Sequence, residues 1–171
     1  TADNELLGRW LDGTPRIHAN RVIVTPRDSP EIHCLDLETG ELIWKRKRED
    51  NLFVGCVDQE VVLLVAPRRV VALSLQDGSS LWAEHSGQFP QEALVSGRGL
   101  LSQGSFYLPL TSGQLAAINM ADGKMVIAPS QQQQVMGNLI CHRGSVISQS
   151  VISINKFEQR SAFLRRTAEA L

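Results

Sequence analysis

A segment of about ten residues recurs along this chain, and its spacing constrains the fold more than any other feature. Each copy has an alternating apolar stretch, a turn that ends in glycine, and a second apolar stretch. The turn glycines are Gly40, Gly78 and Gly123. Glycine at the end of such a turn supplies a positive φ at no steric cost. Each copy is therefore predicted to be a β-hairpin.

One further position extends the repeat. The fourth residue past the glycine is Trp44 in the first copy, Trp82 in the second and Ile127 in the third. A weaker copy precedes them, with Asn4 at the turn and Gly8 at the tryptophan position, and asparagine tolerates the left-handed backbone region. The four turns are 36, 38 and 45 residues apart. A period of about 40 residues is typical of a four-stranded propeller blade.

The residues before each turn also have the pattern of strands. Two apolar stretches joined by a short link precede each glycine, and the pairs are 21–25 with 32–35, 60–66 with 70–73, and 105–110 with 114–118. The links contain proline, arginine or Ser-Gly, which are typical of turns. Residues 138–141 and 145–150 open one more unit. We therefore predict an all-β fold, a partial β-propeller of three to four four-stranded antiparallel blades, over residues 1–154.

A β-sandwich with ordinary core tryptophans is the alternative fold. The spacing favours the propeller, because a sandwich need not repeat its turn at near-constant intervals. Propellers usually have four to eight blades, and this chain supplies three to four and begins inside a unit. An open arc would expose strand edges and an apolar blade face. We therefore expect either further blades in a longer protein or self-association that closes the arc.

The end of the chain shows a different periodicity. Phe157, Leu164, Ala168 and Leu171 recur at helical spacing, and charged residues fill the opposite side. This pattern predicts a short C-terminal amphipathic helix over residues 155–171. The helix either packs on the propeller or begins a following helical domain.

Composition and charge argue against two classes of partner. The net charge is -1 with a pI near 6.4, which gives no general attraction to nucleic acid or to an anionic membrane. Apolar runs such as residues 61–66 are too short to span a bilayer. The charged run 45–50 directly follows Trp44, and on a strand its side chains divide between two faces. We interpret this run as a solvated edge that discourages aggregation.

Histidine and cysteine do not form a metal site in the sequence. His33–Cys34 and Cys141–His142 are mirrored pairs, but adjacent strand residues point to opposite faces. Each pair therefore offers at most one ligand to a single site. With Cys56 these cysteines number three and include no C-x-x-C pair, so we interpret them as small buried hydrophobic residues in strands.

Catalytic motifs are also absent from the sequence. No Gly-x-Ser-x-Gly elbow occurs. Gly97–Arg98–Gly99 lacks the third glycine of a dinucleotide site and is interpreted as a turn between blades. We assign no catalytic, cofactor-binding or metal-binding residue, and we expect no cofactor. The five positions that we single out are structural: Gly40, Trp44, Gly78, Trp82 and Gly123.

The pattern apolar-Asp-apolar-x-x-Gly-x-x-apolar-Trp resembles the pyrroloquinoline-quinone-like (PQQ-like) repeat of the quinoprotein alcohol dehydrogenase-like superfamily. The resemblance implies that Trp44 and Trp82 dock between neighbouring blades, whereas Ile127 and Gly8 depart from the family pattern. The whole pattern also resembles a fragment of large bacterial proteins, of planctomycete type, in which such propellers are joined to helical repeats.

The resemblance implies a range of functions. Active quinoproteins of this family have a vicinal cysteine pair against the quinone and acidic residues around calcium, and this sequence has no Cys-Cys pair. We therefore favour a non-catalytic binding or scaffolding segment of a larger protein that presents loops to a protein or polymer partner. The alternative is a domain of a quinone-dependent dehydrogenase. A third hypothesis is that the segment orients a helical domain after Leu171.

The same resemblance sets our expectations for partners and compartment. The expected partners are a protein, further blades of the same chain, or a second copy, with no nucleic acid and no insertion into a membrane. The expected location is extracytoplasmic or associated with the cell envelope.

Overall fold

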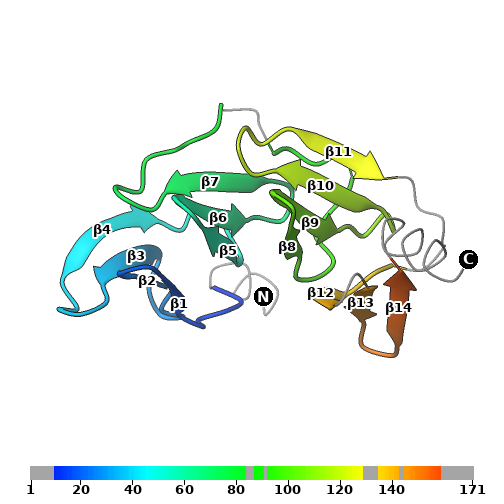
Figure 1. The fold of residues 1–171 in the computed structure, drawn as a ribbon, viewed down its shortest axis with the longest axis horizontal. Coiled ribbons are helices and arrows are strands. Elements are labelled where there is room, and N and C mark those ends of the chain that lie inside the picture. Colours follow the sequence, from blue (N-terminus) through cyan, green and yellow to red (C-terminus); the bar gives the residue numbers. More distant parts are fainter. Residues whose placement is uncertain (1–9, 84–86, 91, 129–134, 143–144, 159–171) are drawn as a thin grey trace, which may run out of the picture. The chain divides into compact units, whose positions relative to one another are not determined.

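The computed structural model describes residues 10–83, 87–90, 92–128, 135–142 and 145–158. Within these ranges the chain forms fourteen β-strands and no helix (Figure 1). Accordingly, this part of the chain has no helix that is long and apolar enough to cross a membrane. The turn predicted at Asn4 and the repeat position Gly8 lie outside the described ranges.

The strands form four sheets in which spatial order follows chain order. The first sheet contains β1 (Arg16–His18), β2 (Arg21–Val24), β3 (Glu31–Asp36) and β4 (Leu42–Lys47). The second contains β5 (Phe53–Asp58), β6 (Val61–Val65) and β7 (Val70–Ser74). The third contains β8 (Leu100–Ser102), β9 (Ser105–Pro109), β10 (Leu115–Asn119) and β11 (Met125–Ala128). The fourth contains β12 (Asn138–His142), β13 (Ser145–Gln149) and β14 (Ile154–Glu158).

The chain divides into two compact units. The first unit comprises Thr1–Phe89 together with Asn119–Met125, so it includes the turn between β10 and β11. The second unit comprises Pro90–Ile118 and Val126–Leu171. The all-β prediction and the antiparallel pairing are confirmed for the described residues. The first and third sheets have the four strands predicted, whereas the second and fourth have three.

The three glycine turns are built by the same hydrogen bonds. The residue four before each glycine accepts, through its side chain, the backbone N–H two residues later, which is a local substitute for a backbone turn. The glycine itself has φ of 71° in all three turns. The side-chain bonds join Asp36 to Glu38 at 3.0 Å, Ser74 to Gln76 at 3.2 Å and Asn119 to Ala121 at 2.8 Å.

The first three sheets also begin with a strand that the sequence pattern did not indicate. Two-residue turns join β1 to β2, β5 to β6 and β8 to β9, and their first residues are Ala19, Gln59 and Gln103. These three residues have φ of 49°, 48° and 50°, the left-handed geometry that two-residue hairpins favour. Only the last of these turns contains a glycine, at position 104, which explains why composition did not mark them.

The core of the first unit lies between one face of the first sheet and one face of the second. The first sheet contributes residues that include Ile23, Ile32 and Cys34, all at most 1% exposed. Burying one aliphatic side chain of this kind stabilises a fold by roughly 1.5–3 kcal/mol. The rest of the cluster consists of Trp10, Trp44, Val54, Val62, Leu64, Leu73 and Leu75.

The second unit has a core of its own and a close backbone approach. Phe106, Leu108 and Ile118 are fully buried there. Gly97 and Gly137 lie so near each other that a Cβ atom on Gly97 would overlap the backbone of Gly137. The segment expected to be a simple turn between blades is thus also a packing contact.

The prediction of a helix from residue 155 is wrong at its start. Residues 154–158 form β14, which pairs antiparallel with β13 and places Phe157 opposite Val146. A tight turn from Ser150 to Ser153, closed by the Ser150 N–H donating to the Ser153 carbonyl at 2.9 Å, joins the two strands. Pairing with an existing strand therefore outweighs the helical spacing of the side chains. The rest of the expected helix, residues 159–171, lies outside the described residues.

The second sheet also differs from the four-stranded expectation. Its fourth strand is reduced to a single antiparallel bridge between Leu73 and Ser80. Trp82 therefore follows a bridge rather than lying within a strand, and it is only half-buried.

Candidate functional site

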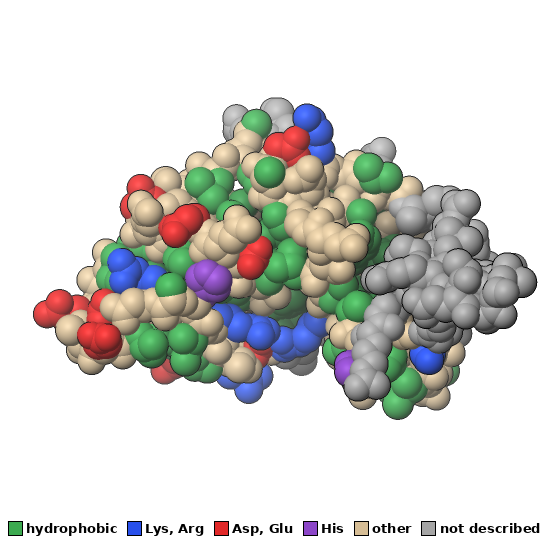
Figure 2. Space-filling view, viewed as in Figure 1, with side chains coloured by type: hydrophobic (Ala, Val, Ile, Leu, Met, Phe, Trp, Pro, Cys, Tyr) green, Lys and Arg blue, Asp and Glu red, His purple; other side chains and the backbone are tan. Residues whose placement is uncertain are grey.

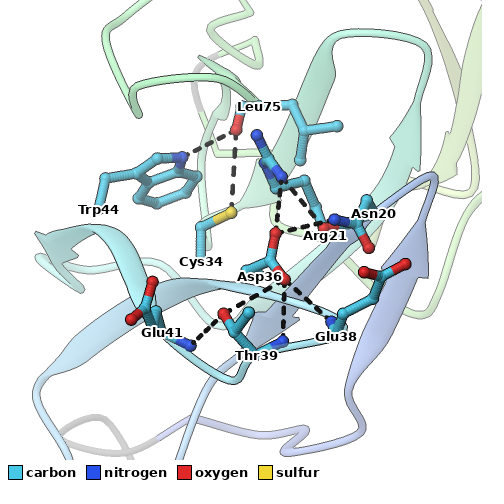
Figure 3. A network of polar contacts seen from close by, with 9 residues as sticks. All are labelled: Asn20, Arg21, Cys34, Asp36, Glu38, Thr39, Glu41, Trp44 and Leu75. Atoms are coloured by element: carbon cyan, nitrogen blue, oxygen red, sulfur yellow. Dashed lines mark hydrogen bonds and ion pairs between the residues drawn. The ribbon is translucent and has the colours of Figure 1, made fainter.

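Trp44 is the side chain that ties the first sheet to the second (Figure 3). Its Nε1 atom donates a hydrogen bond of 2.8 Å to the carbonyl oxygen of Leu75. The Cys34 thiol lies 3.8 Å from the same oxygen. A Cβ atom on Gly78 would come within 2.8 Å of the indole ring, so Gly78 serves both the turn and the docked tryptophan.

The second tryptophan of the repeat makes the equivalent bond within the first unit. Trp82 donates through Nε1 to the carbonyl oxygen of Met120 at 3.2 Å. Leu75 and Met120 hold the same place in the repeat, three residues before the turn glycine. In both cases the tryptophan side chain therefore donates to the same backbone position of the next repeat along the chain. Ile127 has no N–H group in its side chain and cannot form this bond.

The two other turn glycines differ in their surroundings. A Cβ atom on Gly40 would meet no atom within 4 Å, although Gly40 has the same positive φ as Gly78. Gly123 accepts, through its carbonyl oxygen, a hydrogen bond of 3.2 Å from the Gly87 N–H. Backbone conformation is thus common to all three glycines, whereas the tight contact with tryptophan is found at Gly78.

Asp36 is the centre of a polar network beside this contact (Figure 3). Its carboxylate accepts hydrogen bonds from the Asn20 amide at 2.8 Å and from the backbone N–H groups of Glu38 and Thr39, both at 3.0 Å. The Thr39 N–H is the main cause that holds the pKa of Asp36 below its usual range. A carboxylate so occupied stays ionised and organises the turn, and it is poorly suited to proton transfer.

A small pocket lies between the turns of the first unit. Its volume is about 210 Å³, below the roughly 300–1,000 Å³ of typical small-molecule sites. Its lining contains no cysteine, serine, threonine or histidine. The residues around it are Ala19, Asn20, Arg21, Glu60, Leu75 and Gln76.

The cysteines do not behave alike. Cys34 is buried, as predicted, but Cys141 is exposed, so the prediction of burial is wrong for that residue. Burial raises the pKa of Cys56 to about 12. In the described ranges, no three His, Cys, Asp or Glu side chains lie close enough together to hold a metal ion.

A quinone with calcium does not fit the residues of this chain. The sequence has no adjacent cysteine pair, and the described residues bring no three acidic, histidine or cysteine side chains together. We therefore derive no chemistry through such a cofactor.

The charged run after Trp44 has two parts. Residues 45–47 lie exposed on β4, the outer strand, in accordance with their interpretation as a solvated edge. Arg48 instead is buried, and its guanidinium donates to the Asn51 carbonyl oxygen at 2.9 Å. Glu49 and Asp50 form ion pairs with Arg69 at 3.2 and 2.6 Å. Residues 48–50 of the run thus make structural contacts, and strand alternation alone did not predict these contacts.

The second unit contains a larger groove whose lining carries no ionisable side chain. Its volume is about 740 Å³. The Ser96 hydroxyl donates to the Met136 carbonyl oxygen at 2.8 Å and fixes one wall. Figure 2 shows hydrophobic side chains at the surface around β12–β14. The lining residues are Ser96, Val135, Met136, Gly137, Asn138, Gln149, Ser150, Val151 and Ile152.

Two residues at the rim of this groove depart from ordinary turn chemistry. Val151 and Ile152 form the tip of the β13–β14 turn, with exposed fractions of 103% and 91%. The equivalent positions in the first three sheets hold Arg27 and Asp28, Pro67 and Arg68, and Thr111 and Ser112. Polar residues are usual at such positions, so the exposed Val151–Ile152 pair beside this uncharged groove departs from ordinary link chemistry. Sequence reasoning missed it, and the apolar link between two strands was the available signal.

Comparison with known proteins agrees with this fold. A family model described as outer membrane protein assembly factor BamB matches residues 4–161. The chain matches no curated protein by sequence.

Solved structures give the same result for the fold. The computationally designed Ika4 protein is 13% identical, with a TM-score of 0.65 over 86% of this chain and 90% of that one. BamB from Moraxella catarrhalis is 22% identical, with a TM-score of 0.55 over 85% of this chain and 44% of BamB. A europium-containing methanol dehydrogenase is 16% identical, with a TM-score of 0.56 over 72% of this chain and 25% of the enzyme. The chain thus spans less than half of BamB, and these identities show a shared fold alone.

Proposed function

Because the chain belongs to the PQQ-like repeat propeller family described as outer membrane protein assembly factor BamB, we propose that it is a non-catalytic scaffolding segment that binds a protein partner. The observation that carries the proposal is the uncharged groove of the second unit, with Val151 and Ile152 exposed at its rim. Exposed apolar surface of this kind is typical of protein interfaces.

The groove also indicates the chemistry of the partner. None of its nine lining residues is ionisable, so a charged segment would lose its hydration without gaining an ion pair there. An uncharged, extended segment with alternating apolar side chains fits better, because its apolar side chains cover Val151 and Ile152. Strands of outer-membrane barrels have this alternation, and the family description names a factor for the assembly of outer membrane proteins. We place the segment in the cell envelope on the same ground.

A peptide titration tests the proposal. The probe is a fluorescently labelled, uncharged ten-residue peptide that alternates valine and threonine, and the readout is anisotropy. We expect saturable binding to the wild-type chain, and about tenfold weaker binding to the Val151→Ser/Ile152→Ser variant, since tenfold corresponds to about 1.4 kcal/mol. Val126→Ser changes an equally apolar, exposed residue of β11 away from the groove and serves as the matched control. Equal binding by the wild-type chain and the double variant would contradict the proposal.

A second titration separates scaffolding from dehydrogenase chemistry. Pyrroloquinoline quinone with calcium is added to the chain, and the quinone absorbance is followed. We expect no saturable spectral change. Saturable binding with a shifted spectrum would favour the quinone-dependent enzyme instead.

A further inference from the structure

Strand pairing places the first, second and fourth sheets on one common numbering, in which a residue of one sheet has an equivalent in the other two. The second strand begins at Arg21 opposite Asp36 in the first sheet, at Val61 opposite Ser74 in the second, and at Ser145 opposite Glu158 in the fourth. Ile147 and Ile154 of the fourth sheet are therefore equivalent to Ile23 and Ile32 of the first.

The first sheet shows what these positions do when a neighbouring sheet is present. Ile23 and Ile32 are 1% and 0% exposed, because they belong to the core cluster shared with the second sheet. We call the face that carries these positions the onward face. In the fourth sheet the same positions are not covered: Ile154 is 74% exposed and Ile147 is only partly buried. Ile140 lies directly opposite Ile147 and is exposed as well.

The second sheet shows what an onward face packs against. Val57, Val62 and Leu73 lie opposite one another across its three strands and contact the core cluster. We call the face that carries these positions the receiving face. In the first sheet the equivalent row is Ile17, Val22 and Leu35, continued by Leu42 on β4. This row is solvent-accessible, with Ile17 64% exposed and Leu42 51% exposed.

From these two uncovered faces we propose that the occupant of each is a second copy of this chain, with the onward face of the fourth sheet packed on the receiving face of the first sheet of the other copy. Both faces belong to one chain, and they correspond position by position to faces already packed together in the first unit. A two-fold pairing satisfies both faces of both copies.

One position of the onward face differs in chemistry between the first and fourth sheets. Cys34 of the onward face contacts the Leu75 carbonyl oxygen across the existing interface. Lys156 holds the Cys34 position in the fourth sheet, and Leu37 holds the Leu75 position in the first. The Lys156 side chain is longer than that of Cys34, so its apolar stem lies on this face while its ammonium group extends toward water.

Sedimentation velocity of the full 171-residue chain tests the inference. We expect the wild-type chain to sediment as two copies, and Ile154→Glu and Ile17→Glu each to sediment as one, because each change places a carboxylate in both contacts. Both side chains are largely exposed in the single copy, so the fold is retained, which circular dichroism checks. Val126→Glu, at an exposed apolar residue on neither face, is the matched control and stays dimeric.

An equimolar mixture of the two variants makes the test specific. In a mixed dimer one contact carries both substitutions and the other carries none, so we expect the two-copy species to return. A wild-type chain that sediments as one copy would overturn the inference. The two faces would then be covered by something other than a second copy. Variants that remain dimeric, or a mixture that stays monomeric, would overturn it as well. Peptide binding in the groove is measured separately with Ile17→Glu, so failure of this inference and failure of the proposed function are distinguishable.

Discussion

The indole N–H of Trp44 donates a 2.8 Å hydrogen bond to the carbonyl oxygen of Leu75, and thereby joins the first sheet to the second. Trp82 repeats the relationship with Met120 at 3.2 Å. A side chain four residues past one turn glycine thus reaches the backbone three residues before the next. This bond therefore links equivalent positions of two successive repeats, which lie in neighbouring sheets.

Removal of the indole N–H tests the bond directly. Trp44→Phe keeps an aromatic ring but leaves the Leu75 carbonyl without its donor, so we expect the free energy of unfolding to fall by about 1–3 kcal/mol. Trp82→Phe should cost less, because its bond is longer and the side chain is only half-buried. Urea unfolding followed by circular dichroism measures both variants. Equal losses for the two would contradict the difference seen in the structure.

Gly40 and Gly78 form a matched pair for backbone and packing effects. Both have φ of 71°, so alanine at either position incurs a left-handed penalty of about 1–2 kcal/mol. Only at Gly78 does the new Cβ also approach the Trp44 ring, at 2.8 Å, which adds about 1–3 kcal/mol of overpacking. We expect Gly78→Ala to lower the urea midpoint more than Gly40→Ala. Identical midpoints would mean that the ring moves aside at no cost.

The sequence was sufficient for the features that depend on local chemistry. Turn glycines and alternating apolar stretches predicted the last hairpin of each of the first three repeats. A positive φ favours glycine, and burial of one sheet face favours an apolar residue at every second position, so both features are visible in the sequence. The tryptophan position was visible for the same reason. The short first strands were not visible, because turns such as Ala19–Asn20 contain no glycine or proline.

The features that depend on distant partners could not be predicted. Residues 154–158 have side chains compatible with a helix, and their strand conformation follows from pairing with β13. The groove combines Ser96 with residues 135–138 and 149–152, which are far apart in the chain. Buried Arg48 looked like part of an exposed charged run, because strand alternation does not show where the chain turns.

Turn carboxylates should make stability depend on pH. Hydrogen bonds hold the pKa of Asp36 below its ordinary value of 3.8, chiefly through the Thr39 N–H. A lowered folded-state pKa stabilises the fold above the unfolded value, and this contribution is lost as pH falls through the folded value. We therefore expect the urea midpoint to fall from about pH 5 to pH 2.5, less steeply in Asp36→Asn. Trp44→Phe, which removes no carboxylate, should keep the wild-type slope; an unchanged slope in Asp36→Asn would contradict the assignment.

Thiol reactivity should separate the three cysteines. Cys141 is exposed, Cys34 is buried, and burial raises the pKa of Cys56 to about 12. Since the thiolate is the reactive form, we expect one fast thiol per chain with Ellman's reagent at pH 8 and two that react only after unfolding. Cys141→Ser should remove the fast phase. A fast phase that persists in this variant would contradict the burial of Cys34 and the partial burial of Cys56.

A double-mutant cycle between Trp44 and Gly78 tests most directly that the repeat positions meet across neighbouring sheets. Gly78→Ala is measured by urea unfolding in the wild-type chain and in Trp44→Leu, where the smaller side chain leaves room for the new methyl group. Contacting residues couple by about 0.5–3 kcal/mol, so we predict that the cost of Gly78→Ala falls in Trp44→Leu to that of Gly40→Ala. Additive losses, with no coupling, would contradict the docking of Trp44 over Gly78.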